Sequence, residues 1–240
     1  MTLRHLPGDF ADLLSQTGRH ALERNKHRLT AEKPLAWIPG AIRRETAAAM
    51  DALLEEKMAP HLSPLSDAIP PESITGQTRN YQERLRKVAR LRTAYLERRG
   101  KAWAAAERIG LFAMMRSPGF CRFAEAVAGR PLDPKLGVQV LRYAPGDYQG
   151  PHTDHHPENP RAKDGYVDVH LSLPSAAVAD QFLVYARDGH FSEMVNVAAP
   201  GGIAVHRLPF WHYTTPLRAK RGQAAMARRW VILATFLYAK

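Results

Sequence analysis

The sequence predicts an α+β fold in which helices from the first part of the chain support a β-sandwich or barrel built from the rest. Within residues 1–130, apolar residues such as Met50 and Leu54 repeat at helical spacing. Within residues 131–240, they come in short runs separated by Gly, Pro and Asp, which is typical of successive strands. We therefore expect a single domain of 240 residues, with a mainly helical support region at 1–130 and a β-rich core at 131–240.

The support region is expected to contain a polar helical stretch, a strand closed by a Pro-Gly turn, a helix, a loop rich in Pro and Ser, a long basic helix and a short final helix. In the same order, their expected bounds are 1–33, 34–40, 42–58, 59–76, 79 into the 110s, and 117–129. Ser117 and Pro118 mark the start of the last helix, because Ser caps helix N-termini and Pro fits the first turn.

The basic helix, densest over residues 79–101, carries much of the net charge of +11. Tyr81, Leu85 and Val88 repeat there at helical spacing, so we interpret the charge as the solvated face of an amphipathic helix. A surface for nucleic acid or another anionic partner is the alternative.

The β-rich core contains six apolar runs of strand length, and several short strands at such spacing favour a sandwich or barrel. The expected strands are Val138–Tyr143, Tyr166–Leu173, Gln181–Tyr185, Met194–Val197, Ile203–Leu208 and Trp230–Tyr238.

The composition, 45% hydrophobic and 24% charged, is that of a soluble globular protein. No apolar run approaches the roughly 18 residues that a membrane span needs, and the first residues show no charged-then-apolar pattern that would lead us to expect export. Cys121 is the single cysteine, which excludes an internal disulfide and fits a reducing compartment. We expect a cytoplasmic protein without membrane contact, in which Cys121 fills the core rather than acting as a nucleophile.

His152 and Asp154 lie two positions apart at the end of the stretch 143–154. In an extended segment, residues i and i+2 point to the same side, so both side chains can reach a common point. Two histidines and one carboxylate with open positions are what a non-haem Fe(II) site for oxygen activation needs. The residues alone leave open which histidine would complete the set. The candidates are His155, His156, His170, His206 and His212.

Five elements in this order and spacing resemble the superfamily of Fe(II)- and 2-oxoglutarate-dependent dioxygenases. They are the turn Tyr143-Ala-Pro145-Gly146, the pair His152-Thr-Asp154, the turn and strand start Gly201-Gly202-Ile203, His212 followed by Pro216, and Arg229-Trp230 at the start of the last strand. The resemblance covers roughly residues 135–240. It implies that the core is a double-stranded β-helix, or jelly roll, with a metal between its two sheets.

The resemblance also implies a site. Fe(II) would bind His152, Asp154 and His212, which leaves positions for 2-oxoglutarate and O2. The distal carboxylate of 2-oxoglutarate needs a buried cation, and Arg suits this role because its planar fork binds carboxylates at two points. We select Arg229 as this anchor and keep Arg228 as the rival, since only one of two successive strand residues can point inward.

Tyr143 is a candidate hydrogen-bond donor to the co-substrate, or else an aromatic packed at a strand end. His170 could face the cavity, although a core histidine is the preferred interpretation. The expected function is hydroxylation of a C–H bond in a small molecule or in a peptide or protein residue. The residues that choose this substrate are expected in the loops 155–166 and 186–192 and in the helical first half.

Three alternatives stay open. The segment Val169–Pro174 resembles the branch that demethylates alkylated nucleic acid, but Thr235 stands where that branch carries a second Arg. A non-enzymatic jelly-roll binding protein and a zinc hydrolase are the others. The sequence does not indicate an oligomeric state.

Overall fold

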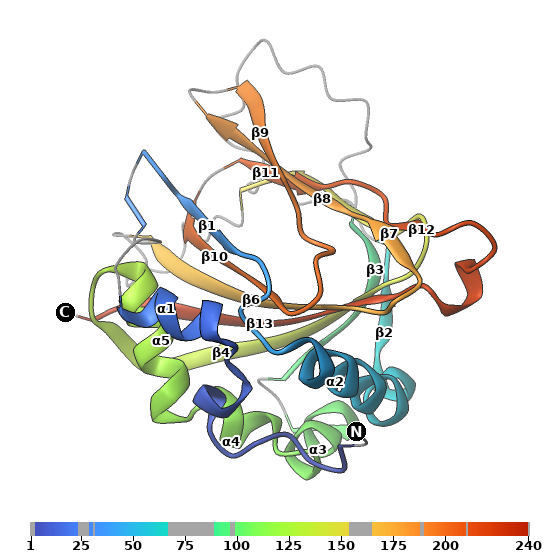
Figure 1. Ribbon diagram of the computed structural model, residues 1–240, viewed down its shortest axis with the longest axis horizontal. Helices are drawn as coiled ribbons and strands as arrows, with labels where there is room; N and C mark the ends of the chain where they lie inside the picture. The colour runs from blue at the N-terminus through green and yellow to red at the C-terminus, as the bar shows by residue number, and fades with distance from the viewer. Residues whose placement is uncertain are drawn as a thin grey trace.

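The computed structural model describes residues 3–23, 29–30, 32–66, 89–96, 99–153, 165–187, 190–209 and 211–239 (Figure 1). In the first part of the chain the elements are η1 (Phe10–Leu13), α1 (Gln16–Glu23), β1 (Leu35–Ile38), α2 (Arg44–Lys57), η2 (Ala59–His61), β2 (Ser63–Leu65), β3 (Ala89–Tyr95), α3 (Lys101–Arg108), α4 (Leu111–Met115) and α5 (Pro118–Ala128). The second part contains β4 (Leu132–Tyr143), β5 (Tyr148–His152), β6 (Tyr166–Pro174), β7 (Val178–Asp180), β8 (Phe182–Arg187), β9 (His190–Asn196), β10 (Gly202–Leu208), β11 (His212–Thr214), β12 (Arg218–Ala219), η5 (Ala224–Met226) and β13 (Arg229–Tyr238).

One antiparallel sheet of eleven strands forms most of the described structure. Its strand order is β1-β10-β6-β13-β4-β3-β5-β11-β8-β9, with β2 paired to β3. In Figure 1 the sheet bends back on itself, so that β11, β8 and β9 lie across from β10, β6, β13 and β4, and β5 pairs with β11. Strands far apart in sequence thus become neighbours, as β10, β6 and β13 are. The predicted jelly roll, a double-stranded β-helix supported by helices, is confirmed.

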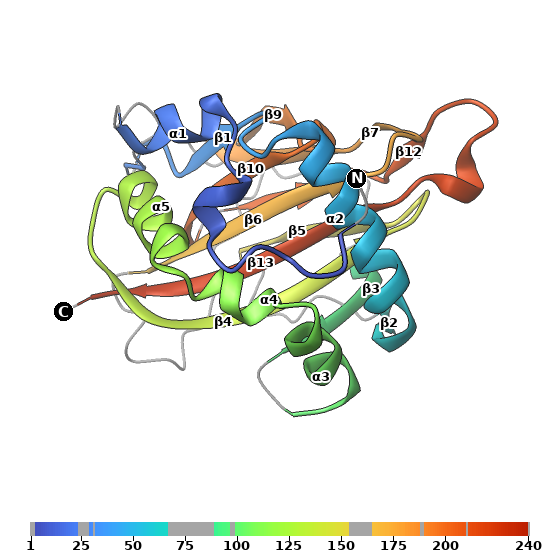
Figure 2. The same cartoon turned by 60° about the horizontal axis from the view of Figure 1, so that its bottom comes forward.

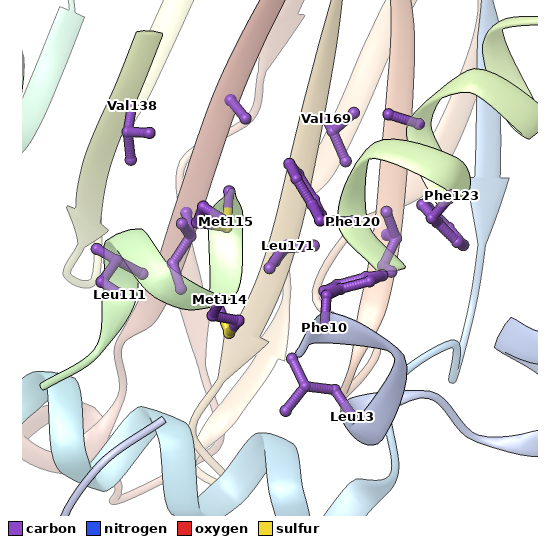
Figure 3. Close-up of a cluster of buried hydrophobic side chains, with 14 of the residues drawn as sticks. Phe10, Leu13, Leu111, Met114, Met115, Phe120, Phe123, Val138, Val169 and Leu171 are labelled. Atoms are coloured by element: carbon purple, nitrogen blue, oxygen red, sulfur yellow. The ribbon is translucent and has the colours of Figure 1, made fainter. Parts of the chain in front are cut away.

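The helices cover the outer face of the layer formed by β6, β13 and β4 (Figure 2). On β6, Val167, Val169 and Leu171 belong to the same apolar core as the helices, and Figure 3 shows Val169 and Leu171 beside Phe120. Because successive strand residues point to opposite faces, Asp168 and the other even-numbered residues of β6 face the interior between the two layers.

The N-terminal segment is held against α5 by a shared cap. Ser117 Oγ accepts hydrogen bonds from the backbone N–H of Phe120 at 3.2 Å and of Phe10 at 3.0 Å. The first bond caps α5, as the sequence predicted, and the second anchors η1 beside it. The rings of Phe10 and Phe120 then pack edge to face, with centroids 5.0 Å apart (Figure 3).

The predicted basic helix, from 79 into the 110s, is wrong in its middle part, whereas its later part is helical as α3 and α4. Residues 89–95 form the strand β3, which pairs with β4 and β5 and so connects the two layers. Leu91 and Thr93 are buried while Arg90 and Arg92 are exposed, a period of two that belongs to a strand. Pairing with long neighbouring strands therefore outweighs the helical spacing of the apolar residues. The segment 67–88, which includes Tyr81 and Leu85, lies outside the described residues.

Other elements of the support region follow the expectation more closely. The strand at 34–40 and the helix at 42–58 are confirmed as β1 and α2, and both expected helical stretches near the N-terminus and at 117–129 contain helix. Cys121, however, is partly exposed rather than buried. Burial of its thiol and the nearby Glu125 carboxylate raise the pKa of Cys121, which disfavours the nucleophilic thiolate. Among the described helices, none has both the length and the apolar character of a membrane span.

Candidate functional site

His152 and His212 are direct neighbours across two antiparallel strands. The last residue of β5 pairs in register with the first residue of β11, and both imidazoles are buried. Side chains at paired positions are close, and here the ring centroids lie 4.4 Å apart with the planes at 52°. Two of the three side chains that the sequence nominated as ligands are therefore side by side in the interior.

The tautomer of the neutral His152 imidazole is set by a local contact. Its Nδ1 lies 2.7 Å from the carbonyl oxygen of Gly150. Since a carbonyl only accepts hydrogen bonds, Nδ1 carries the hydrogen and Nε2 keeps a lone pair. A histidine oriented in this way, through its second ring nitrogen, is typical of metal-binding histidines.

The nominated carboxylate, Asp154, lies outside the described residues, as do His155 and His156. Within the ranges that the structure describes, no three His, Cys, Asp or Glu side chains gather as a metal ion would need. The described part thus supplies two nitrogen donors, and the third ligand remains a prediction.

Two more histidines extend the pair across the interior. The ring of His206, on β10, lies 5.5 Å from that of His212 and 4.4 Å from that of His170, on β6. Asp168 follows, with Oδ2 3.9 Å from His170 Nε2. Sequence reasoning treated His170 and His206 as rival ligands and missed Asp168. The signal was present, because Asp168 and His170 share one face of an otherwise apolar strand.

Arg229 begins β13 and points into the same interior. Its side chain is only 4% exposed. Nε donates to Gln181 Oε1 at 2.7 Å and Nη1 donates to Ser172 Oγ at 3.1 Å. The guanidinium carbon lies 4.8 Å from the centre of the Tyr143 ring, a cation–π contact. All of these partners are neutral.

The electrostatics of Arg229 are unusual for that reason. Burial lowers its pKa to about 10, so the guanidinium is still charged at neutral pH. No carboxylate of the described residues contacts it. A buried charge without a counter-ion is costly, so this position is suited to a carboxylate that arrives with a ligand.

Gln181 holds Arg229 in place, a role that sequence reasoning did not assign. Its side chain is fully buried, and Nε2 donates to the carbonyl oxygens of Thr215 at 3.0 Å and Asp147 at 3.3 Å. These bonds leave Oε1 aimed at Arg229 Nε. In the sequence, Gln181 was visible only as the first residue of the expected strand Gln181–Tyr185.

Arg228 points the opposite way, toward α2. Nε and Nη2 donate to the two carboxylate oxygens of Asp51 at 2.9 and 2.8 Å, and Glu55 lies 3.3 Å from Nε. Burial raises the pKa of Asp51 to about 6 against the opposing effect of Arg228, so Asp51 is ionised at neutral pH. Arg228 therefore ties α2 to the sheet, and Arg229 is the member of the pair that faces the interior.

Replacing Arg228 by Met should destabilise the protein by about 2 to 3 kcal/mol, because Asp51 would remain buried without its cation. The free energy of unfolding in urea measures this. Arg218→Met is the matched control, since Arg218 is exposed and its ion pair with Asp180 spans 3.5 Å. The control should cost less than about 1 kcal/mol. Equal losses in the two variants would contradict the assignment.

No protein-family model matches the chain, and no curated protein matches it. Solved structures do. A 2OG-Fe(II) oxygenase family oxidoreductase from Burkholderia pseudomallei aligns over 99% of this chain and 95% of its own, with 15% identity and a TM-score of 0.54. SnoN, a non-heme alpha ketoglutarate dependent epimerase from nogalamycin biosynthesis, aligns over 92% and 84%, with 15% identity and a TM-score of 0.57. SnoK, a carbocyclase from the same biosynthesis, aligns over 95% and 86%, with 14% identity and a TM-score of 0.52. The chain thus has the fold of these oxygenases.

Proposed function

We propose that this protein is an Fe(II)- and 2-oxoglutarate-dependent dioxygenase. His152, Asp154 and His212 would bind the metal, and Arg229 would bind the distal carboxylate of 2-oxoglutarate. One observation carries the proposal: a buried pair of histidines shares the barrel interior with a buried arginine that has no carboxylate partner among the described residues. The fold shared with 2OG-Fe(II) oxygenases supports it.

The histidine pair fits a divalent iron site in its chemistry. Imidazole nitrogens suit Fe(II), and His152 presents Nε2 as the nitrogen with a lone pair. Asp154, two residues after His152, is the carboxylate that completes the proposed set of three. When bound, Fe(II) would supply the activation of O2, which protein side chains alone cannot perform.

Arg229 fits the co-substrate because its orientation is fixed before the ligand arrives. Gln181 and Ser172 engage Nε and one N–H of Nη1, which leaves the other N–H groups of the fork for a carboxylate. The Tyr143 ring packs on the guanidinium and restrains its plane. In this proposal Tyr143 is a positioning residue, and its hydroxyl is a candidate donor to the co-substrate.

The interior also excludes water from the reacting groups. His152, His212 and Arg229 are all buried, and electrostatic interactions are stronger where water is absent. A bound carboxylate would therefore interact strongly with Arg229. The substrate C–H bond would have to be placed near the histidine pair by residues other than these.

Hydroxylation of a C–H bond, in a small molecule or in a peptide or protein residue, is the outcome that we propose first. The neighbours named as an epimerase and a carbocyclase carry the same fold. Inversion of a stereocentre or ring closure is therefore an alternative outcome on the same scaffold.

Adding Fe(II) and 2-oxoglutarate without oxygen tests the site. We expect a weak visible charge-transfer band, because a bidentate 2-oxo acid on Fe(II) absorbs in this range. Protein loaded with Zn(II) should lack the band and serves as the control. If the Fe(II) protein also lacks it, the proposed function is wrong, and zinc-dependent hydrolysis becomes the better hypothesis.

A further inference from the structure

The interior face of β6 connects the two parts of the proposed site. Ser172 contacts Arg229. The ring of His170, two residues earlier, packs at a tilt against that of His206, whose ring in turn meets that of His212 edge to face. Asp168 is the next interior position. Along one strand the chain thus passes from the co-substrate anchor, past His170, which is linked to His212 through His206, to a carboxylate.

Asp168 is a buried carboxylate with few partners. It is 5% exposed, and Oδ1 has no hydrogen-bond partner in the described part of the chain. His170 is close by, but its Nε2 lies 3.9 Å from Oδ2, too far for a hydrogen bond. His170 Nε2 also lacks a hydrogen bond to the described residues. Its side chain is 21% exposed, so the pair borders solvent.

Asp51 provides a comparison, because it is a buried carboxylate with a structural role. Asp51 is equally buried, but two donors of Arg228 satisfy it. Asp168 has no such cation among the described residues, and its cross-strand neighbours are His206 and Thr235. A buried carboxylate left in this way is costly for stability, which favours a role in binding.

The interior therefore holds two opposite charges, and neither contacts an oppositely charged Lys, Arg, Asp or Glu in the described chain. Arg229 carries a positive charge at one end of the strand pair, and Asp168 carries a carboxylate at the other. If the first receives the co-substrate carboxylate, the second is suited to a positively charged group. Ring contacts of 4.4 and 5.5 Å separate His170 from His212, so such a group would sit several bonds from the reacting carbon.

We infer that Asp168 and His170 form the subsite for the primary substrate and that this subsite takes a cationic nitrogen, either an ammonium or a guanidinium group. The inference rests on the proposed function and gives its substrate class. Asp168 would receive the N–H donors of the cation. His170 would flank it and separate it from the metal ligands.

Binding of small probes without oxygen tests this subsite. Butylguanidine and pentylamine are the cationic probes, and butylurea and pentanol, which carry no charged nitrogen, are their neutral counterparts. With Zn(II) and 2-oxoglutarate bound, the wild-type protein should bind at least one cationic probe about tenfold more tightly than its neutral counterpart. Asp168→Asn should remove that preference, whereas Asp180→Asn, whose carboxylate pairs with the exposed Arg218 across β7 and β12, should keep it. Equal binding of cationic and neutral probes, or binding of none, would overturn the inference.

A second measurement does not depend on the probe. If Asp168 is held for binding, Asp168→Asn relieves an unsatisfied charge, and the unliganded protein should melt about 2 to 4 °C higher. A lower Tm would show a structural role and overturn the inference. Neither measurement needs turnover. Failure of the proposed function would instead appear as the absence of succinate formation by the wild-type protein, so the two failures can be distinguished.

Discussion

Replacing Arg229 by Met should weaken the binding of 2-oxoglutarate by about 100-fold or more and leave the unliganded protein at least as stable as the wild type. The first effect follows because a buried ion pair between Arg and a carboxylate loses about 2 to 5 kcal/mol when one partner is removed. The second follows because Arg229 is a buried cation whose contacts are all neutral. Equilibrium titration with 2-oxoglutarate and unfolding in urea measure the two effects.

The neighbouring Arg228 provides the matched control. It faces α2 and pairs with Asp51, so Arg228→Met should keep the affinity for 2-oxoglutarate and lose stability. The two variants differ by one position in the chain and should show opposite phenotypes. If Arg228→Met lost 2-oxoglutarate binding while Arg229→Met bound it normally, the assignment of Arg229 as the anchor would be wrong.

Replacing His212 by Ala should remove iron from the protein. Loss of a residue that only supports a metal ligand costs 10- to 100-fold in metal affinity, so loss of a ligand should cost more than about 100-fold. Succinate formation from 2-oxoglutarate should fall to the level without protein. Metal content after dialysis against Fe(II) without oxygen, followed by the succinate assay, measures both.

His20→Ala is the control for His212→Ala. His20 is exposed on α1 and belongs to none of the segments assigned to the site. This variant should keep its iron and its activity. Retention of iron and of succinate formation by His212→Ala would show that another residue completes the metal site.

The β-rich core could be predicted because its strands are short apolar runs divided by turn residues. All six expected strands are present, as β4, β6, β8, β9, β10 and β13. The register between strands could not be predicted in the same way. The pairing of His152 with His212 depends on the path of the chain between them, and periodicity does not contain this information.

The orientations of Arg228 and Arg229 at the start of the last strand were likewise beyond what the sequence alone could predict. The sequence established that only one of Arg228 and Arg229 could face inward. The choice depends on where β13 begins relative to β4 and β6, which fixes Arg229 opposite Tyr143. The acidic residues of α2 then explain the outward member, a long-range contact without a signal in the spacing of the sequence.

The support region was harder to predict because the residues in and before β3 show both the period of a strand and the spacing of a helix. The Arg residues of β3 alternate with buried ones, as strand pairing requires, while apolar residues before it repeat at helical spacing. Contacts with β4 and β5 settle the structure of 89–95 in favour of a strand. Asp168 escaped attention for a different reason: its significance lies in the partners that it lacks, and these appear only in three dimensions.

Formation of succinate from 2-oxoglutarate, measured with and without O2, tests the central claim most directly. With Fe(II), the wild-type protein should form succinate only when O2 is present, and substitution of Zn(II) should abolish the reaction. Succinate formation that is independent of O2, or its absence with Fe(II) and O2 in the presence of both the cationic and the neutral probes, would contradict the account.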